Sequence, residues 1–194
     1  MARADDVIGY GAAAKALHWL AALCVIMAWL IGTFIDDFPK SLGGAAIFTH
    51  MSLGLTVLAL LFVRLGWRLG NPPPPFAASV FSPWSERAAT LVHWLLYALM
   101  LALPVSGIVL QFARGQAVPL FGLFEIASPW ARDRALSRSV LEVHGLLADS
   151  LLILAGLHAL AALAHHYVLK DDTLMRMLPG RMLPGARRLT PPPL

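Results

Sequence analysis

Seven histidines are the residues best suited to chemistry in this chain of 194 residues. An imidazole can bind a metal through a ring nitrogen, or carry a proton near neutral pH. Each histidine lies in or beside a long apolar stretch, where ionisable side chains are costly and usually face a bundle interior. One such histidine is readily explained as a buried, hydrogen-bonded side chain, but seven together favour a shared function. They are His18, His50, His93, His144, His158, His165 and His166.

The composition places these histidines in a membrane protein. Hydrophobic residues make up 58% of the chain and charged residues 13%, against about 45–50% and roughly 25% in soluble domains. Four apolar stretches reach the roughly 20 residues that a spanning helix needs, at residues 16–35, 45–67, 88–113 and 140–169. We predict an all-α, integral-membrane four-helix bundle over residues 1–179, followed by a basic, proline-rich tail over residues 180–194.

Lysine and arginine are divided unevenly between the two sides of this bundle. Ten lie on the side that holds both termini and five on the other side. Because cytoplasmic segments carry the excess, both termini are expected in the cytoplasm. Basic residues beside apolar runs favour the bilayer over nucleic acid as the partner. The outer five are Lys40, Arg114, Arg132, Arg134 and Arg138, four of them in a predicted loop over residues 114–139 that shows no strand-like alternation.

Chain direction assigns a depth to each histidine. The first span starts at the inner face, so His18, close to its start, lies near that face. The second and fourth spans start at the outer face, so His50 and His144 lie near the outer face. His158 follows His144 by 14 residues, which is about 21 Å further in on nearly the same helix face. The depths therefore predict an outer pair, His50 with His144, and an inner pair, His18 with His158.

Two histidine pairs at different depths suit two haems, each bound by two imidazoles across the bundle. Filling both axial positions favours electron transfer over oxygen chemistry. The sequence has no Cys-x-x-Cys-His motif, so the haems would be non-covalent haem b. A zinc site fits less well, because it needs three or four ligands at one depth. Glycines near these histidines, such as Gly32, Gly54 and Gly107, would allow a flat ring close to the backbone.

Five segments resemble the bacterial cytochrome b561 family, the dihaem membrane type that includes superoxide:quinone oxidoreductases. They are YGAAAKALHWL (10–20), FTHMSLGL (48–55), LVHWLLYALMLALPVSG (91–107), LEVHGLL (141–147) and GLHALAALAHHYVLKDDTLMRMLP (156–179). The resemblance covers nearly the whole chain and implies a multi-pass protein of the bacterial inner membrane. It implies the same haem ligands, His18, His50, His144 and His158, and it implies that His93 does not bind iron.

The remaining histidines and the outer charges suggest where electrons enter and leave. His93, His165 and His166 cluster near the inner face, where a histidine could hydrogen-bond ubiquinone and pass a proton. Interfacial anchoring or contacts to haem propionates would explain them equally well. The five outer basic residues could steer superoxide, the donor that the resemblance implies, or they could bind lipid phosphates or pair with nearby acids.

Other functions stay open at this point. The chain could be a cytochrome b anchor subunit that links quinone to a partner dehydrogenase or hydrogenase, or a transporter without haem. A homodimer is also open. Asp149 departs from the neutral residue that the family leads us to expect in the fourth span. A bonded, structural role is favoured for it over a proton relay, since it lies roughly 140° around the helix from His144.

Overall fold

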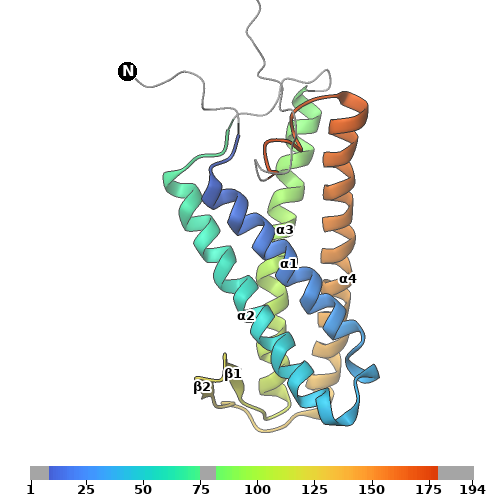
Figure 1. Ribbon diagram of the computed structural model, residues 1–194. Coiled ribbons are helices and arrows are strands. Elements are labelled where there is room, and N and C mark those ends of the chain that lie inside the picture. Colours follow the sequence, from blue (N-terminus) through green and yellow to red (C-terminus); the bar gives the residue numbers. More distant parts are fainter. Residues whose placement is uncertain (1–8, 75–81, 179–194) are drawn as a thin grey trace, which may run out of the picture.

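A computed structural model describes residues 9–74 and 82–178 (Figure 1). Four of its helices are long and apolar enough to cross a membrane, which confirms the predicted all-α bundle. A short 3₁₀ turn follows the first helix, a two-stranded hairpin precedes the last, and a π-helical turn ends the last. The elements are α1 (Ala12–Thr33), η1 (Ile35–Asp37), α2 (Lys40–Gly70), α3 (Ser82–Ala113), β1 (Val118–Leu120), β2 (Phe124–Ile126), α4 (Arg134–Ala164) and η2 (His165–Leu169).

The helices pack as two antiparallel pairs. Helix α1 lies along α2, α3 lies along α4, and the contact of α2 with α3 joins the pairs (Figure 1). Large apolar side chains such as Phe62, Leu146 and Leu160 are more than half exposed on the outside of the bundle. In a bilayer such side chains face lipid, so the outward apolar surface is explained by the membrane.

The fourth helix begins earlier than the predicted span. The Asp133 carboxylate accepts a hydrogen bond from the Leu136 backbone N–H at 3.0 Å and so caps the helix at its first turn. Arg134 and Arg138 are therefore helical, and their predicted place in the outer loop is wrong. The other end also differs from a plain helix, because α4 gives way at His165 to the wider turn of η2.

The loop between α3 and α4 contains a β-hairpin that the sequence analysis did not predict. Strands β1 and β2 are antiparallel, with Val118 opposite Ile126 and Leu120 opposite Phe124. Each strand has three residues, too few for an alternating pattern to stand out. Gly122 turns the chain at a φ of 73°, a conformation that glycine adopts without strain. Strand β1 packs on α2 and α3 at the end of the bundle away from the start of α1 (Figure 1). We call this end the outer end and the opposite one the inner end.

After η2 the chain folds back over the inner end of the bundle, and we call residues 170–178 the return segment (Figure 1). Two side chains of α1 hold it. Lys15 Nζ donates to the Leu178 carbonyl at 3.0 Å, and Trp19 Nε1 donates to the Met177 carbonyl at 2.9 Å. The first helix is thereby tied to the last part of the chain that the structure describes. The boundary at residue 179 and the tail over 180–194 lie outside the described residues.

Candidate functional site

The structure brings His50 of α2 and His144 of α4 together near the outer end of the bundle. Their ring centroids lie 6.0 Å apart, with an angle of 68° between the ring planes. Two imidazoles that bind one metal ion from opposite sides, at about 2.0 Å each, have centroids on the order of 6 Å apart. The separation therefore has the size that one shared metal ion requires.

The hydrogen bonds of this outer pair fix the ring tautomers. His50 Nδ1 lies 2.8 Å from the Ala28 carbonyl oxygen, which can only accept. His144 Nδ1 lies 2.8 Å from the Ser106 hydroxyl, whose own proton goes to the Leu103 carbonyl. Both Nδ1 atoms therefore donate, which leaves the Nε2 lone pairs available to a metal. Metal-binding histidines are usually oriented by a second hydrogen bond of this kind.

Two glycines lie directly behind the outer histidines. A Cβ at Gly32 would be 2.9 Å from His50 Cε1, and a Cβ at Gly107 would be 3.5 Å from His144 Cε1. Between the helices is an apolar cavity that both rings border, lined also by Val25, Trp29, Gly54, Met100, Pro104 and Leu151. Donor nitrogens, close backbone and apolar walls fit a haem at this level.

The inner level holds three histidines. The rings of His18 on α1 and His158 on α4 have centroids 6.3 Å apart, close to the separation of the outer pair. His93 of α3 also packs edge-on against His158, at 5.2 Å between centroids. That distance is shorter than the roughly 6 Å expected for two rings on one metal ion. The geometry therefore favours His18 with His158 and leaves His93 as a neighbour.

Two arginines of α2 lie at this inner level, and the sequence analysis counted them only as cytoplasmic charge. Arg64 Nη1 is 3.1 Å from His18 Nδ1, and its guanidinium carbon is 5.8 Å from the centre of the Tyr97 ring. Arg68 donates to the Tyr97 hydroxyl at 3.4 Å. A signal was available, because arginines four apart in an apolar stretch share one helix face and are costly there.

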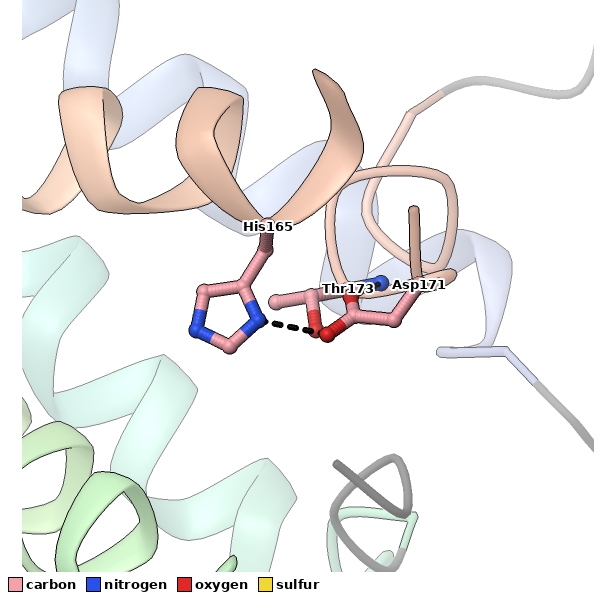
Figure 2. A network of polar contacts seen from close by, with 3 residues as sticks. All are labelled: His165, Asp171 and Thr173. Atoms are coloured by element: carbon pink, nitrogen blue, oxygen red, sulfur yellow. Dashed lines mark hydrogen bonds and ion pairs between the residues drawn. The ribbon is translucent and has the colours of Figure 1, made fainter. Parts of the chain in front are cut away.

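The histidines at the end of α4 have different partners. His165 Nδ1 lies 2.6 Å from the Asp171 carboxylate, whose other oxygen accepts from the Thr173 backbone N–H at 2.9 Å (Figure 2). His166 packs against the ring of Tyr167, with centroids 4.8 Å apart. The three histidines of the predicted cluster, His93, His165 and His166, each contact a different residue.

At the outer face, Arg114 and Arg132 line a second pocket together with Glu125 and the buried Gln111. Gln111 donates to the Met51 sulfur at 3.1 Å, and these two residues line both this pocket and the apolar cavity. They therefore separate the basic pocket from the outer histidine pair. Gln111 was not among the residues predicted from the sequence. Lys40 lies instead in the first turn of α2, and Arg134 and Arg138 lie in the first two turns of α4.

Asp149, the unexpected acid of the fourth span, has a polar neighbour. Trp29 Nε1 of α1 donates to its carboxylate at 3.4 Å. Trp29 also lines the apolar cavity, so this bond joins α1 to α4 along one edge of it. The bond agrees with the predicted structural role.

Four spanning helices with histidine rings paired at two levels are characteristic of membrane cytochromes b, which transfer electrons. The sequence profile of the prokaryotic cytochrome b561 family matches residues 9–180, and the chain belongs to that family. It is accordingly a multi-pass protein of the bacterial inner membrane with a haem b electron-transfer role.

Named relatives cover most of the chain. A Yersinia pestis protein named probable superoxide oxidase CybB is 38% identical over 165 residues, which cover 85% of this chain and 93% of that protein. Cytochrome b561 homolog 2 of Escherichia coli is 34% identical over 171 residues, covering 87% and 90%. Cytochrome b562 of Cereibacter sphaeroides is 30% identical over 181 residues, covering 89% and 97%.

Proposed function

We propose that this protein binds two haems b and passes electrons from periplasmic superoxide to ubiquinone. His50 and His144 would hold the outer haem, and His18 and His158 the inner one. The observation that carries the proposal is the repeated ring separation, 6.0 Å at one level and 6.3 Å at the other. His144 and His158 lie on the unbroken helix α4, 14 residues or about 21 Å apart along its axis.

The inner site requires one rearrangement before it can hold iron. A guanidinium only donates, so the contact with Arg64 makes His18 Nδ1 an acceptor and puts the ring proton on Nε2. A metal at Nε2 therefore requires Arg64 to release His18. A haem carries propionate carboxylates, and arginine pairs readily with such groups. Arg64 and Arg68 would bind these carboxylates and thereby free His18 as a ligand.

The two ends of the bundle would have different substrates. At the outer end, the positive charges of Arg114 and Arg132 in the pocket, together with Lys40, Arg134 and Arg138 near the starts of α2 and α4, would attract superoxide. Each superoxide gives up one electron and leaves as oxygen. With the termini in the cytoplasm, the inner end would be where ubiquinone takes up two electrons and two protons. The haems, when bound, supply the one-electron steps between these ends.

Among the inner histidines, we assign the contact with ubiquinone to His165. Its ring is 24% exposed, whereas His93 packs against His158. The two Nδ1 bonds at the outer pair leave that end with no free histidine proton to deliver, which also favours the inner end for quinone. The Yersinia pestis protein named probable superoxide oxidase supports superoxide as the donor.

The test begins with the visible spectrum of the purified protein and a haem-to-protein ratio. Two haems b per chain are expected. Superoxide should then reduce them, and a soluble ubiquinone analogue should reoxidise them. One haem in folded protein would refute the paired arrangement. Two haems that superoxide does not reduce, together with a stoichiometric partner on co-purification, would instead favour an anchor subunit.

A further inference from the structure

His165 and Asp171 form a pair outside the proposed haem sites. Helix α4 widens at His165 into the π-helical turn η2, and π turns are often found at functional sites. Lys170 then adopts a left-handed conformation with a φ of 55°, which reverses the chain. The Asp171 backbone N–H donates to the His165 carbonyl at 3.1 Å. The reversal therefore brings the Asp171 side chain beside the imidazole of His165.

The pair is held from several sides. The carboxylate of Asp171 is 12% exposed, and its second oxygen accepts from the Thr173 backbone N–H (Figure 2). Burial works against ionisation of Asp171, but the hydrogen bonds from His165 and Thr173 outweigh it and lower the pKa of this carboxyl below its usual value. The bonds of Lys15 and Trp19 to the return segment fix the loop that carries Asp171.

The contact sets the proton arrangement of His165. A carboxylate can only accept, so Nδ1 of His165 donates to Asp171. Figure 2 shows the other ring nitrogen, Nε2, on the side of the ring away from Asp171. When the ring takes up a second proton, Nε2 becomes a donor while Nδ1 keeps its bond to the carboxylate.

We infer that Asp171 is a positioning residue that prepares His165 to protonate quinone at the inner end of the bundle. This inference rests on the proposed function. The protonated ring donates from Nε2 to a quinone carbonyl oxygen. As electrons from the donor reduce the quinone, the N–H bond at Nε2 breaks and an O–H bond forms. His165 is left neutral with Nδ1 still bound to Asp171, and water recharges it for the second proton.

The experiment follows the two halves of the reaction separately in intact, haem-loaded protein. Superoxide reduces the haems, and a ubiquinone analogue is then added while the haem bands are recorded. In Asp171→Asn, haem reduction by superoxide and both haem bands should be unchanged. The rate of reoxidation at saturating quinone should fall about 10–100-fold, as loss of an orienting partner typically does, with KM near the wild-type value.

The matched control is Asp172→Asn, which removes the same charge one residue further along the return segment and should behave as wild type. Asp171→Glu keeps the charge and should restore most of the rate. Because Asp171 acts through His165, adding Asp171→Asn to His165→Gln should cause no further loss. If Asp171→Asn loses haem, the comparison is made between Asp171→Glu and His165→Gln, which leave a carboxylate in place.

The outcomes separate the two hypotheses. If Asp171→Asn reoxidises as fast as Asp172→Asn, the positioning role is wrong. A rise in KM with an unchanged maximal rate would also overturn it, because that pattern means binding rather than proton delivery. Full additivity in the double variant would show that Asp171 does not act through His165. If wild-type haems are not reoxidised by quinone at all, the proposed function fails instead.

Discussion

Replacing Gly32 by alanine is the sharpest test of the outer haem site. The added methyl carbon would lie 2.9 Å from Cε1 of His50, closer than real Cβ atoms approach, and 3.2 Å from its Nδ1, a tight contact. The ring cannot simply turn away, because its Nδ1 is bonded to the Ala28 carbonyl on the same helix as Gly32. To reach an ordinary contact the ring must retreat by about 0.5 Å, or α1 must move away from α2.

The size of the effect follows from that displacement. Overpacking by one methyl group costs about 1–3 kcal/mol in a close-packed interior. Since about 1.4 kcal/mol is a factor of ten in affinity, the outer site should bind haem about 5–150-fold more weakly. The inner pair lies about 21 Å away along α4 and should not respond.

The assay is a redox titration of the purified variant together with its haem-to-protein ratio. The outer component should lose amplitude while the inner one keeps both its amplitude and its potential. Gly107→Ala is the matched comparison, since its methyl would make an ordinary 3.5 Å contact with His144. Gly66→Ala is the control for helix propensity, because a methyl there meets no described atom within 4 Å. Equal haem content in Gly32→Ala and Gly66→Ala would refute the reasoning.

Three further predictions follow from the same structure. His144→Ala should remove the outer haem and spare the inner one, which a two-component redox titration would show; loss of the inner component alone would reverse the assignment. In the wild type, salt should slow haem reduction by superoxide, because the Debye length falls from about 10 Å at 0.1 M to about 3 Å at 1 M and the attraction is screened. The double variant Arg114→Gln with Arg132→Gln lacks that attraction, so its reduction should be slower at low salt and independent of salt. Stopped-flow rates equal to wild type at every salt concentration would exclude steering. Asp149→Leu should raise the free energy of unfolding in detergent by about 1–3 kcal/mol, since it removes an acidic residue that costs about 2.5–3.5 kcal/mol in a span and loses one hydrogen bond of about 0.5–1.5 kcal/mol; a variant that stops transferring electrons would show that the acid is functional.

The bundle could be predicted because its determinants are local in the sequence. Four apolar stretches of sufficient length specify four spans, and the chain direction then sets the depth of His50 and His144. The residues at which the helices begin and end were harder to predict from the sequence. The cap at Asp133 extends α4 backwards, and a single acid before an arginine-rich stretch is a weak signal. The hairpin of β1 and β2 was missed because its strands are too short for periodicity to show.

The inner end of the bundle shows what sequence patterns could not supply. The contact of Arg64 with His18 joins two helices, and it depends on how each is rotated about its axis. Nothing in the sequence marks Asp171 as the partner of His165 either. That contact needs a π-helical turn and a left-handed lysine, where glycine would have been the recognisable residue. Both contacts are set by packing rather than by spacing.

The bonds of Lys15 and Trp19 to the return segment also determine when the inner end can be completed during synthesis. These contacts span 163 and 158 residues of sequence, so nearly the whole chain must leave the ribosome before they form. His18 can pair with His158 only after His158 has been synthesised, whereas His50 and His144 are both available earlier and their pairing involves neither end of the chain. The half that holds His50 and His144 can therefore assemble while the nascent chain is still being inserted, and the half that holds the return segment closes last.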